Sequence, residues 1–387
     1  MFAVNNLTFG ANASVTGTGG LAVSGSGVFQ ENKSVALSGG LTVNSGTLRD
    51  GVTNAFSTAQ AATVRAAGTL DLNGLSNSIT TLTMESGSTS GASVTTGAGT
   101  LSLGGNVTLS VNGSGSTNAS ISGNLDLGGA TRTFTVSAGT GTETSDLSVS
   151  AVVSGATFGV TKAGPGLLAL SGTNIYTGAT TINAGTLSIS TINNGGVAGN
   201  LGQATNAAAN LVLGGGILQY TGATTSTDRA FTLTAATNST IDVVSGSTNL
   251  TMSGASANTT GALTKTDNGT LTLSGANAYT GSTTINGGIL AISADNNLGT
   301  APGAATAGQL KLGGGTLETT ASFTLNSNRG ISLTADSTIS TDPSTTLTYN
   351  GIMTGGNAFT KAGTGTLIFG GANTDSDVTT ISAGTLS

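Results

Sequence analysis

The chain has 387 residues, of which 36% are hydrophobic and only 7% are charged, and its formal net charge is −6. It contains neither cysteine nor histidine, so disulfides and thiolate or imidazole metal sites are excluded. The basic residues are scattered instead of clustered, which argues against nucleic-acid binding, and no apolar run reaches the length of a membrane span. We therefore expect no cofactor, no metal, no nucleic-acid partner and no direct membrane insertion.

Residues 1–124 are the least regular part of the chain, but they contain short runs in which apolar and small polar residues alternate. Such alternation is typical of strands with one buried face. The stretch 67–88 holds three runs around a predicted Asn-Gly turn at Asn73 and Gly74. The alanine-rich segment 51–68 is expected to form either a short helix or a loop excursion.

Residues 125–387 show a longer repeat of about 100 residues, as expected of a duplicated set of coils. Two series of basic residues mark it: Arg132, Arg229 and Arg329, and then Lys162, Lys265 and Lys361. The arginines are 229 − 132 = 97 and 329 − 229 = 100 residues apart. At this spacing they cannot form one joint site, so we expect each arginine to hydrogen-bond backbone carbonyls at a corner of the fold.

The clearest pattern is a motif at Thr161–Ser190, TKAGPGLLALSGTNIYTGATTINAGTLSIS, which returns at Thr264–Ser293 and begins again at Thr360. Its short alternating runs are separated by turn-forming glycine, asparagine and serine, so they predict strands joined by turns. One such unit cannot bury its apolar face alone, whereas stacked copies can. The positions expected to be structural are Asn174, Asn277 and Asn373 in one phase of the motif, and Tyr176 and Tyr279 in another.

This motif resembles the passenger-associated transport repeat of bacterial autotransporters. The shared string is GxGxLxLSGxNxYTGxTTINxGxLxIS, which Gly166–Ser190 and Gly269–Ser293 carry well. The third copy departs from it, with Gly370 in place of the serine and Asp375 in place of the tyrosine. The resemblance implies a right-handed β-helix that is secreted and displayed at a bacterial surface, whereas the residues alone imply only stacked strands.

The predicted fold is therefore all-β: one right-handed parallel β-helix, or solenoid, over residues 1–387. At about 20 residues per coil, it would have about 18–20 coils. A β-sandwich or a propeller made of similar short strands is the alternative, but propellers usually carry an aromatic-rich signature in each blade. With aromatic residues at 4%, the chain favours the solenoid.

Two stretches without alternation, 193–210 and 295–309, are the candidates for loops that leave the stacked coils. Binding residues often lie on loops that project from a rigid scaffold. The alternative is that both stretches are plain connections without a ligand.

The sequence offers no catalytic constellation. Enzymatic β-helices need carboxylates or basic groups that converge on one face, whereas the sixteen acidic residues here mostly stand alone. Asp375 and Asp377 fall only in the degenerate third copy and are expected to lie in a solvated loop. Calcium-binding GGxGxD units and phosphate-binding loops are absent, and Thr-x-Thr pairs occur too irregularly to favour ice binding.

These observations predict a non-enzymatic stalk or adhesin passenger segment that spaces or displays groups at a bacterial surface, either attached there or secreted. The alternatives are a carbohydrate-binding or carbohydrate-cleaving β-helix, and a filament-forming extracellular fibre or matrix protein. Surface glycans and host or matrix proteins are the expected partners.

A second copy of the chain is a further expected partner. The starting sequence MFAVNNLTFG lacks the pattern of a signal peptide, and the final stretch, TTISAGTLS, stops within a motif copy. Both stretches favour β-structure and carry no charge, and neither is a polar cap. We therefore expect a portion of a longer protein, whose open β-helix edges would stack end to end.

Overall fold

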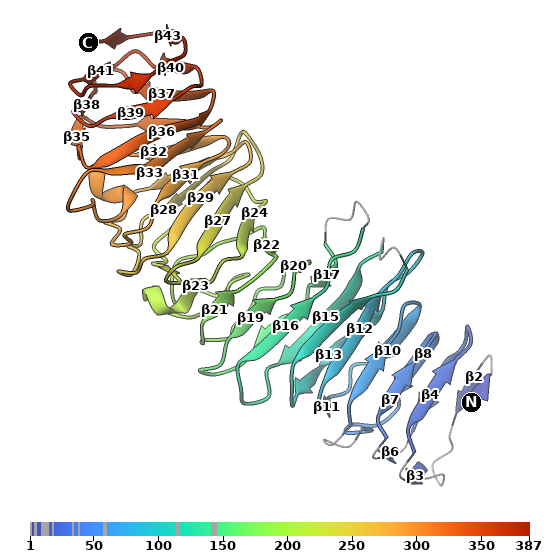
Figure 1. Ribbon diagram of the computed structural model, residues 1–387. Helices are drawn as coiled ribbons and strands as arrows, with labels where there is room; N and C mark the ends of the chain where they lie inside the picture. Colours follow the sequence, from blue (N-terminus) through green and yellow to red (C-terminus); the bar gives the residue numbers. More distant parts are fainter. Residues whose placement is uncertain are drawn as a thin grey trace. The chain divides into compact units, whose positions relative to one another are not determined.

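The computed structural model of the chain describes residues 2–3, 6–8, 15–17, 19–32, 35–37, 39–56, 60–113, 117–140 and 145–387. The chain divides into two compact units. The first comprises residues 1–189 and 196–204, and the second comprises residues 190–195 and 205–387. Each unit is a stack of short strands that pair in parallel with strands of the neighbouring coils (Figure 1).

In the first unit, two long sheets form two sides of the stack, and a pair of strands lies beside them. The first sheet holds β1 (Phe2–Ala3), β4 (Leu21–Ser24), β7 (Leu41–Val43), β9 (Ala62–Val64), β12 (Leu82–Ser86), β14 (Val107–Val111), β16 (Arg132–Val136), β19 (Val160–Ala163) and β21 (Thr180–Ile182). The second sheet holds β2 (Asn6–Thr8), β5 (Val28–Glu31), β8 (Gly46–Asp50), β10 (Gly68–Asp71), β11 (Asn77–Ile79), β13 (Ser93–Leu103), β15 (Ala119–Asp126), β17 (Leu147–Val149), β18 (Val152–Ser154), β20 (Leu167–Leu170) and β22 (Thr186–Ile189). The separate pair is β3 (Val15–Gly17) with β6 (Val35–Leu37).

In the second unit, the strands form three sides of the stack. One side holds β24 (Ile217–Tyr220), β27 (Asn238–Val243), β29 (Ala262–Thr266), β31 (Thr283–Ile285), β33 (Thr306–Gly313), β36 (Arg329–Ala335), β39 (Met353–Gly355) and β42 (Thr374–Asp375). Another holds β25 (Thr225–Thr227), β28 (Asn249–Met252), β30 (Thr270–Leu273), β32 (Ile289–Ile292), β34 (Thr316–Thr319), β37 (Ser337–Thr341), β40 (Phe359–Ala362) and β43 (Thr379–Ile381). The third side contains β23 (Leu211–Leu213) paired with β26 (Thr232–Leu233), and then β35 (Phe323–Leu325), β38 (Thr346–Tyr349), β41 (Thr366–Phe369) and β44 (Thr385–Leu386).

The described residues contain no α-helix. Their helical elements are two short 3-10 turns, η1 (Ala208–Asn210) and η2 (Asp295–Leu298). The segment 51–68 accordingly forms no helix at the positions described. It contains β9, although positions 57–59 lie outside the described residues. The predicted Asn-Gly turn is confirmed, because Asn73 and Gly74 have φ values of 52° and 77°.

The core of each unit consists of like residues stacked in register. In the second unit, Leu250 pairs with Leu271, Leu271 with Leu290, and Leu290 with Leu317 on successive coils. All four leucines are fully buried, with 0% of their surface exposed. Thr251 and Thr272, which follow the first two leucines along their strands, are partly exposed on the other face, as the period of two in a strand requires. The prediction that the alternating leucines face the core is confirmed, since Leu168 and Leu170 of the first unit are also buried.

The coils differ in length because the loops between strands differ. Leu168 pairs with Leu187 on the next coil, whereas Leu290 pairs with Leu317, so the second of these coils holds more residues than the first. As a result the solenoid has about 16 turns, fewer than the expected 18–20. The estimate assumed about 20 residues in every coil, and several coils hold more.

Candidate functional site

The motif places a buried lysine at a corner between two strands. Lys162 lies near the end of β19 with its side chain inside the stack and 0% of its surface exposed. Its Nζ donates hydrogen bonds to the carbonyls of Ala163 at 2.9 Å, Gly164 at 2.7 Å and Ala184 at 3.0 Å. Ala163 and Gly164 form the corner of the same coil, whereas Ala184 lies in the corner of the next coil. One ammonium group therefore joins two stacked corners.

The same arrangement recurs in the other two copies. Lys265 donates to the carbonyls of Thr266, Asp267 and Gly287, and Lys361 donates to those of Ala362, Gly363 and Ala383. Burial lowers the pKa of Lys162 and of Lys265 to about 8, and it also lowers the pKa of Lys361. Among the described residues, none of the three forms an ion pair with a carboxylate. These lysines were recognised in the sequence only as markers of spacing; their presence in every motif copy was the signal of a common role.

The asparagines of the motif connect three successive coils. Asn174 Oδ1 accepts a hydrogen bond from the Val153 amide at 2.8 Å, and its Nδ2 donates to the Asn200 carbonyl at 2.8 Å. Asn277 repeats this with the Ser256 amide and the Asn297 carbonyl, both at 2.7 Å. In the third copy, Asn373 accepts from the Met353 amide at 2.9 Å.

The tyrosines of the motif lie inside the stack. Tyr176 and Tyr279 have no exposed surface, and their hydroxyls are 2.7 Å from those of Thr180 and Thr283. Burial raises the pKa of Tyr279 to about 12, so its phenol stays protonated near neutral pH. In the third copy Asp375 stands at this position in β42, which limits any tyrosine role to the first two copies.

Each of the three repeated arginines binds backbone carbonyls in its own surroundings. Arg132 donates to the carbonyls of Leu103, Leu127 and Gly128, and Arg229 donates to that of Asn193 at 2.8 Å. Arg329 is 1% exposed, and it binds a carboxylate in addition to carbonyls.

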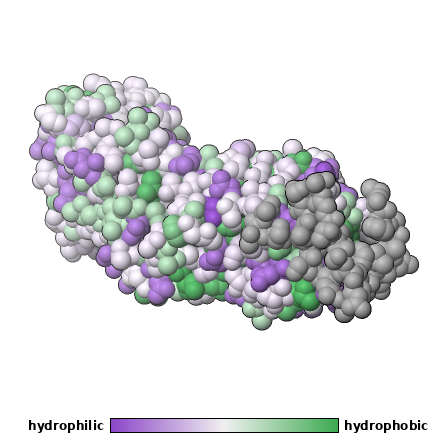
Figure 2. Space-filling view, turned by 90° about the horizontal axis from the view of Figure 1, so that it is seen from below, coloured by the Kyte–Doolittle hydropathy of each residue, from purple (hydrophilic) through white to green (hydrophobic). Residues whose placement is uncertain are grey.

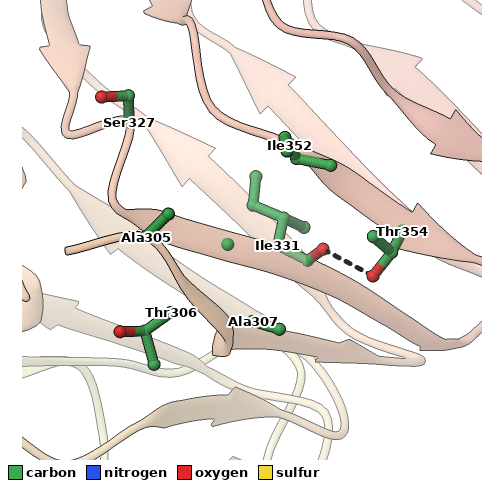
Figure 3. A pocket seen from close by; sticks show the side chains of 8 residues that line it. Ala305, Thr306, Ala307, Ser327, Ile331, Ile352 and Thr354 are labelled. Atoms are coloured by element: carbon green, nitrogen blue, oxygen red, sulfur yellow. Dashed lines mark hydrogen bonds between the residues drawn. The ribbon is translucent and has the colours of Figure 1, made fainter.

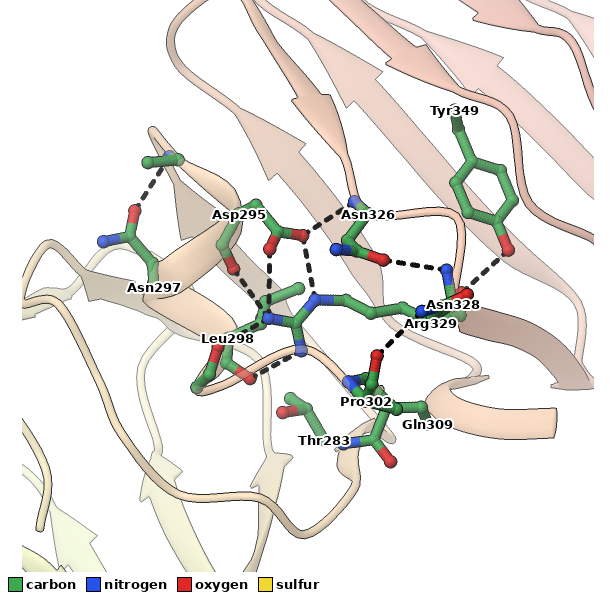
Figure 4. A network of polar contacts seen from close by, with 12 residues as sticks. Thr283, Asp295, Asn297, Leu298, Pro302, Gln309, Asn326, Asn328, Arg329 and Tyr349 are labelled. Carbon is green, nitrogen blue, oxygen red and sulfur yellow. Dashed lines mark hydrogen bonds and ion pairs between the residues drawn. The ribbon is translucent and has the colours of Figure 1, made fainter. Parts of the chain in front are cut away.

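Arg329 fixes the base of the candidate loop 295–309 (Figure 4). Its Nε and Nη2 donate to the two oxygens of the Asp295 carboxylate at 2.8 and 3.2 Å. Its guanidinium also donates to the carbonyls of Leu298 at 3.1 Å and Gly299 at 2.5 Å. A planar guanidinium with several donors suits such a cluster of acceptors. The loop therefore begins on η2, from a position held by an ion pair between the buried Arg329 and the partly exposed Asp295.

The far end of this loop is also held by hydrogen bonds. Gln309 Nε2 donates to the carbonyls of Thr280 and Gly281 at 3.1 and 2.9 Å, and Asn328 Nδ2 donates to the Pro302 carbonyl at 2.9 Å. Between these anchors, positions 303–307 are exposed. The loop thus presents small residues to solvent from a fixed base.

The other candidate stretch, 193–210, contains both buried and exposed residues. Leu201 and Asn200 are buried, and Asn200 Nδ2 donates to the Gly172 carbonyl at 3.0 Å, whereas Val197 is 51% exposed. Since Asn200 belongs to the network of Asn174, this stretch serves packing as well as connection.

Some of the acidic residues that look isolated in the sequence lie next to one another in the structure. Glu31 and Asp50 pair in register on β5 and β8, and both are fully buried. Burial raises the pKa of Asp50 to about 7; Asn77 donates to its carboxylate and opposes the rise, whereas the charges of Asp71 and Glu31 add to it. The signal was spacing, since positions 31 and 50 lie one coil apart.

A second pair of neighbouring carboxylates, Asp242 and Asp267, lies beside the second motif copy. Burial raises the pKa of Asp242, and the neighbouring carboxylate of Asp267 adds to the rise. Asp267 has a φ of 59°, and the matching positions in the other copies are Gly164 at 75° and Gly363 at 69°. A residue with a side chain therefore occupies a left-handed position that favours glycine.

The described part of the chain shows no cluster of metal-binding side chains. There, no three or more His, Cys, Asp or Glu side chains come together in a way that could hold a metal ion. In the same residues, no helix has the length and apolar character required to cross a membrane.

Two comparisons with known proteins both match this chain to sequences of autotransporters. The passenger-associated-transport-repeat family model matches residues 160–189, 263–292 and 359–387, including the divergent third copy. The chain is 37% identical over 258 residues, 63% of its length, to "Adhesin BmaC autotransporter" of Brucella suis biovar 1 (strain 1330). It spans only 7% of the length of that relative. No solved structure matches the chain.

The stacked coils and the three repeats together define a β-solenoid that contains passenger-associated transport repeats. The chain thus carries three copies of the passenger-associated transport repeat and is similar, over part of its length, to a small portion of the adhesin autotransporter BmaC.

Proposed function

We propose that the chain is a non-enzymatic scaffold within an adhesin passenger, which displays the loop 295–309 at a bacterial surface or in a secreted protein. The observation that carries the proposal is the Arg329–Asp295 ion pair, which anchors an exposed loop on a stack of repeated coils. A rigid base with an exposed tip is the arrangement in which scaffolds commonly place binding residues.

The surface chemistry supports a role in display and adhesion. Only 7% of the residues are charged, and on the face shown in Figure 2 the strongly hydrophilic residues are scattered between near-neutral ones. A surface of hydroxyl and amide groups stays hydrated without a strong electric field. We propose host or matrix proteins, or surface glycans, as partners.

The second candidate function is action on a carbohydrate, which the Asp242 and Asp267 carboxylates favour. Glycosidases typically use two carboxyl groups, of which the general acid has a raised pKa. Asp242, with its raised pKa, and Asp267 would be such a pair. Yet Asp242 is only 6% exposed, and its carboxylate accepts hydrogen bonds from Gln219 and Thr266. Such a group is poorly placed to reach a substrate.

Two assays separate these functions. Bacteria that display residues 1–387 on their surface should adhere to immobilised matrix proteins or glycans more strongly than bacteria without the segment. The purified chain should release no reducing ends from a panel of acidic and neutral polysaccharides. Turnover that is lost in an Asp242→Asn, Asp267→Asn variant would instead establish the enzyme, and equal adhesion with and without the segment would refute the adhesin role.

A further inference from the structure

A pocket of about 240 Å³ lies beside the displayed loop in the second unit (Figure 3). One wall comes from the loop and the start of β33, and the other comes from the coils that follow. The lining residues are Ala305, Thr306 and Ala307 on the loop side, and Ser327, Gly330, Ile331, Ile352 and Thr354 on the scaffold side.

One hydrogen bond joins the loop wall to the scaffold wall, and two others order the scaffold wall. The Thr306 amide donates to the Asn328 carbonyl at 2.9 Å, next to the buried Arg329. The Ile331 amide donates to the Tyr349 hydroxyl at 3.2 Å, and this hydroxyl donates to the Arg329 carbonyl at 2.8 Å. Because these bonds position both walls before any ligand arrives, the pocket is preformed, and binding would cost little ordering entropy.

The lining is apolar, and two of its three hydroxyl groups have intramolecular acceptors. Ile331 is 1% exposed and lines the buried end of the pocket, whereas Ile352 is 46% exposed and lies at the rim of the pocket. The Thr354 hydroxyl donates to the Ile331 carbonyl at 3.4 Å, and the Thr306 hydroxyl donates to the Ala304 carbonyl at 3.0 Å. None of the eight lining residues is charged or aromatic.

This chemistry decides between classes of ligand. A sugar needs converging hydrogen-bond groups and usually an aromatic face, and the pocket provides neither. Small-molecule sites usually enclose roughly 300–1,000 Å³, so this pocket is too small for most of them. Single apolar side chains, in contrast, commonly serve as anchors that fill such pockets at protein interfaces.

We propose that this pocket binds one aliphatic or aromatic side chain of a protein partner, and that it is the point at which the displayed loop engages that partner. The proposal rests on the adhesin role proposed above, and it narrows the partner from glycan or protein to protein. Neutral lining residues match an apolar anchor and would disfavour a charged one, because a buried unpaired charge is costly.

The test uses the whole chain with isoleucine methyl groups labelled for NMR. N-acetyl-leucine methylamide and N-acetyl-phenylalanine methylamide serve as side-chain probes, and N-acetylglucosamine serves as the sugar probe. We expect saturable shifts of the Ile331 and Ile352 methyl signals with at least one side-chain probe and none with the sugar. Ala305→Phe should fill the pocket and weaken probe binding by about tenfold or more, because a well-filled anchor site dominates such contacts.

Ala304→Phe is the matched control, since Ala304 is exposed on the same loop but does not line the pocket. It should leave probe binding unchanged, and an unaltered methyl spectrum elsewhere would show that both variants fold. No shift with either side-chain probe, or shifts only with the sugar, would overturn the proposal.

Adhesion is measured separately on displaying bacteria, with a matrix-protein panel. Adhesion that Ala305→Phe abolishes and Ala304→Phe preserves supports the pocket as the point of contact. Adhesion that both variants preserve overturns it while leaving the adhesin role intact. Probe binding without any adhesion refutes the adhesin role alone and leaves the side-chain site established.

Discussion

The ammonium group of Lys162 and the carbonyl of Ala184 lie 3.0 Å apart, although 22 residues separate them in the chain. Lys265 and Gly287 are likewise 22 residues apart, as are Lys361 and Ala383. The bond from one corner to the next is therefore a property of the motif, and it survives in the third copy, where the tyrosine does not.

The buried lysines predict a rise in stability at alkaline pH. The pKa of Lys162 and Lys265 is about 8 in the fold and 10.5 as the unperturbed value. Between these values the unfolded chain binds more protons than the folded chain, so the free energy of unfolding should increase with pH from about 8 to about 10.5. Urea unfolding at several pH values measures this slope.

Replacing one lysine isolates its share of the pH dependence. Lys162→Met should flatten the slope, whereas Lys311→Met, at an exposed position, should leave it as it is. An unchanged slope in Lys162→Met would show that the lysine stays charged throughout this range.

Removing the loop anchor should loosen the loop 295–309. Arg329→Met leaves Asp295 without its partner and the Leu298 and Gly299 carbonyls without their donor. Breaking a fully buried ion pair from one side typically costs about 3–5 kcal/mol, and the loss here should be smaller because the Asp295 side chain is 25% exposed. Hydrogen exchange should show faster exchange of the loop amides.

The matched control is Arg49→Met. Arg49 is 39% exposed and pairs with Asp71 at 2.8 Å, and pairs of this kind contribute about 0–1 kcal/mol. Equal losses of stability in the two variants would contradict an anchoring role for Arg329.

Truncating a core leucine should be costly where a neighbouring threonine is not. Leu271→Ala removes buried methyl groups between Leu250 and Leu290, and the expected loss is about 2–5 kcal/mol. Thr272→Ala loses one surface hydrogen bond, from its hydroxyl to Asn249 Oδ1 at 2.9 Å, and should cost about 1 kcal/mol or less. Similar losses in thermal or urea unfolding would mean that the leucine site collapses to fill the gap.

The buried acid in the first unit predicts the opposite dependence on pH. Burial, together with the charges of Asp71 and Glu31, raises the pKa of Asp50 from 3.8 to about 7, so the folded state holds a proton that the unfolded state releases earlier. Its contribution is fully present below pH 3.8 and is lost as the pH rises through about 7. Asp50→Asn should remove this slope, and Asp377→Asn, at an exposed position in the other unit, should not.

The sequence predicted the strand path well because the path is governed by local alternation. The stacked leucines, the turn at Asn73 and Gly74 and the parallel pairing all follow from a period of two and from turn chemistry. The number of coils was harder to predict, because loops such as 295–309 add residues without adding strands. The number of residues in a coil therefore cannot be read from the alternation of apolar and polar residues.

Contacts between coils were the main feature that sequence reasoning missed. Glu31 and Asp50 look isolated in the sequence because they meet only after the chain has wound through one coil. The Arg329–Asp295 pair joins two successive coils, of which the first is lengthened by the loop 295–309. Counting one regular coil forward from each charged residue would have found the first pair but not the second.

Each matched repeat contains both the lysine and the carbonyl that it reaches in the next coil, as with Lys162 and Ala184 within residues 160–189. A tandem duplication of that stretch would therefore copy a complete bond, together with the strands that bury it. Duplication of such stretches would lengthen the solenoid, so the length of the stack can vary in steps of whole repeats.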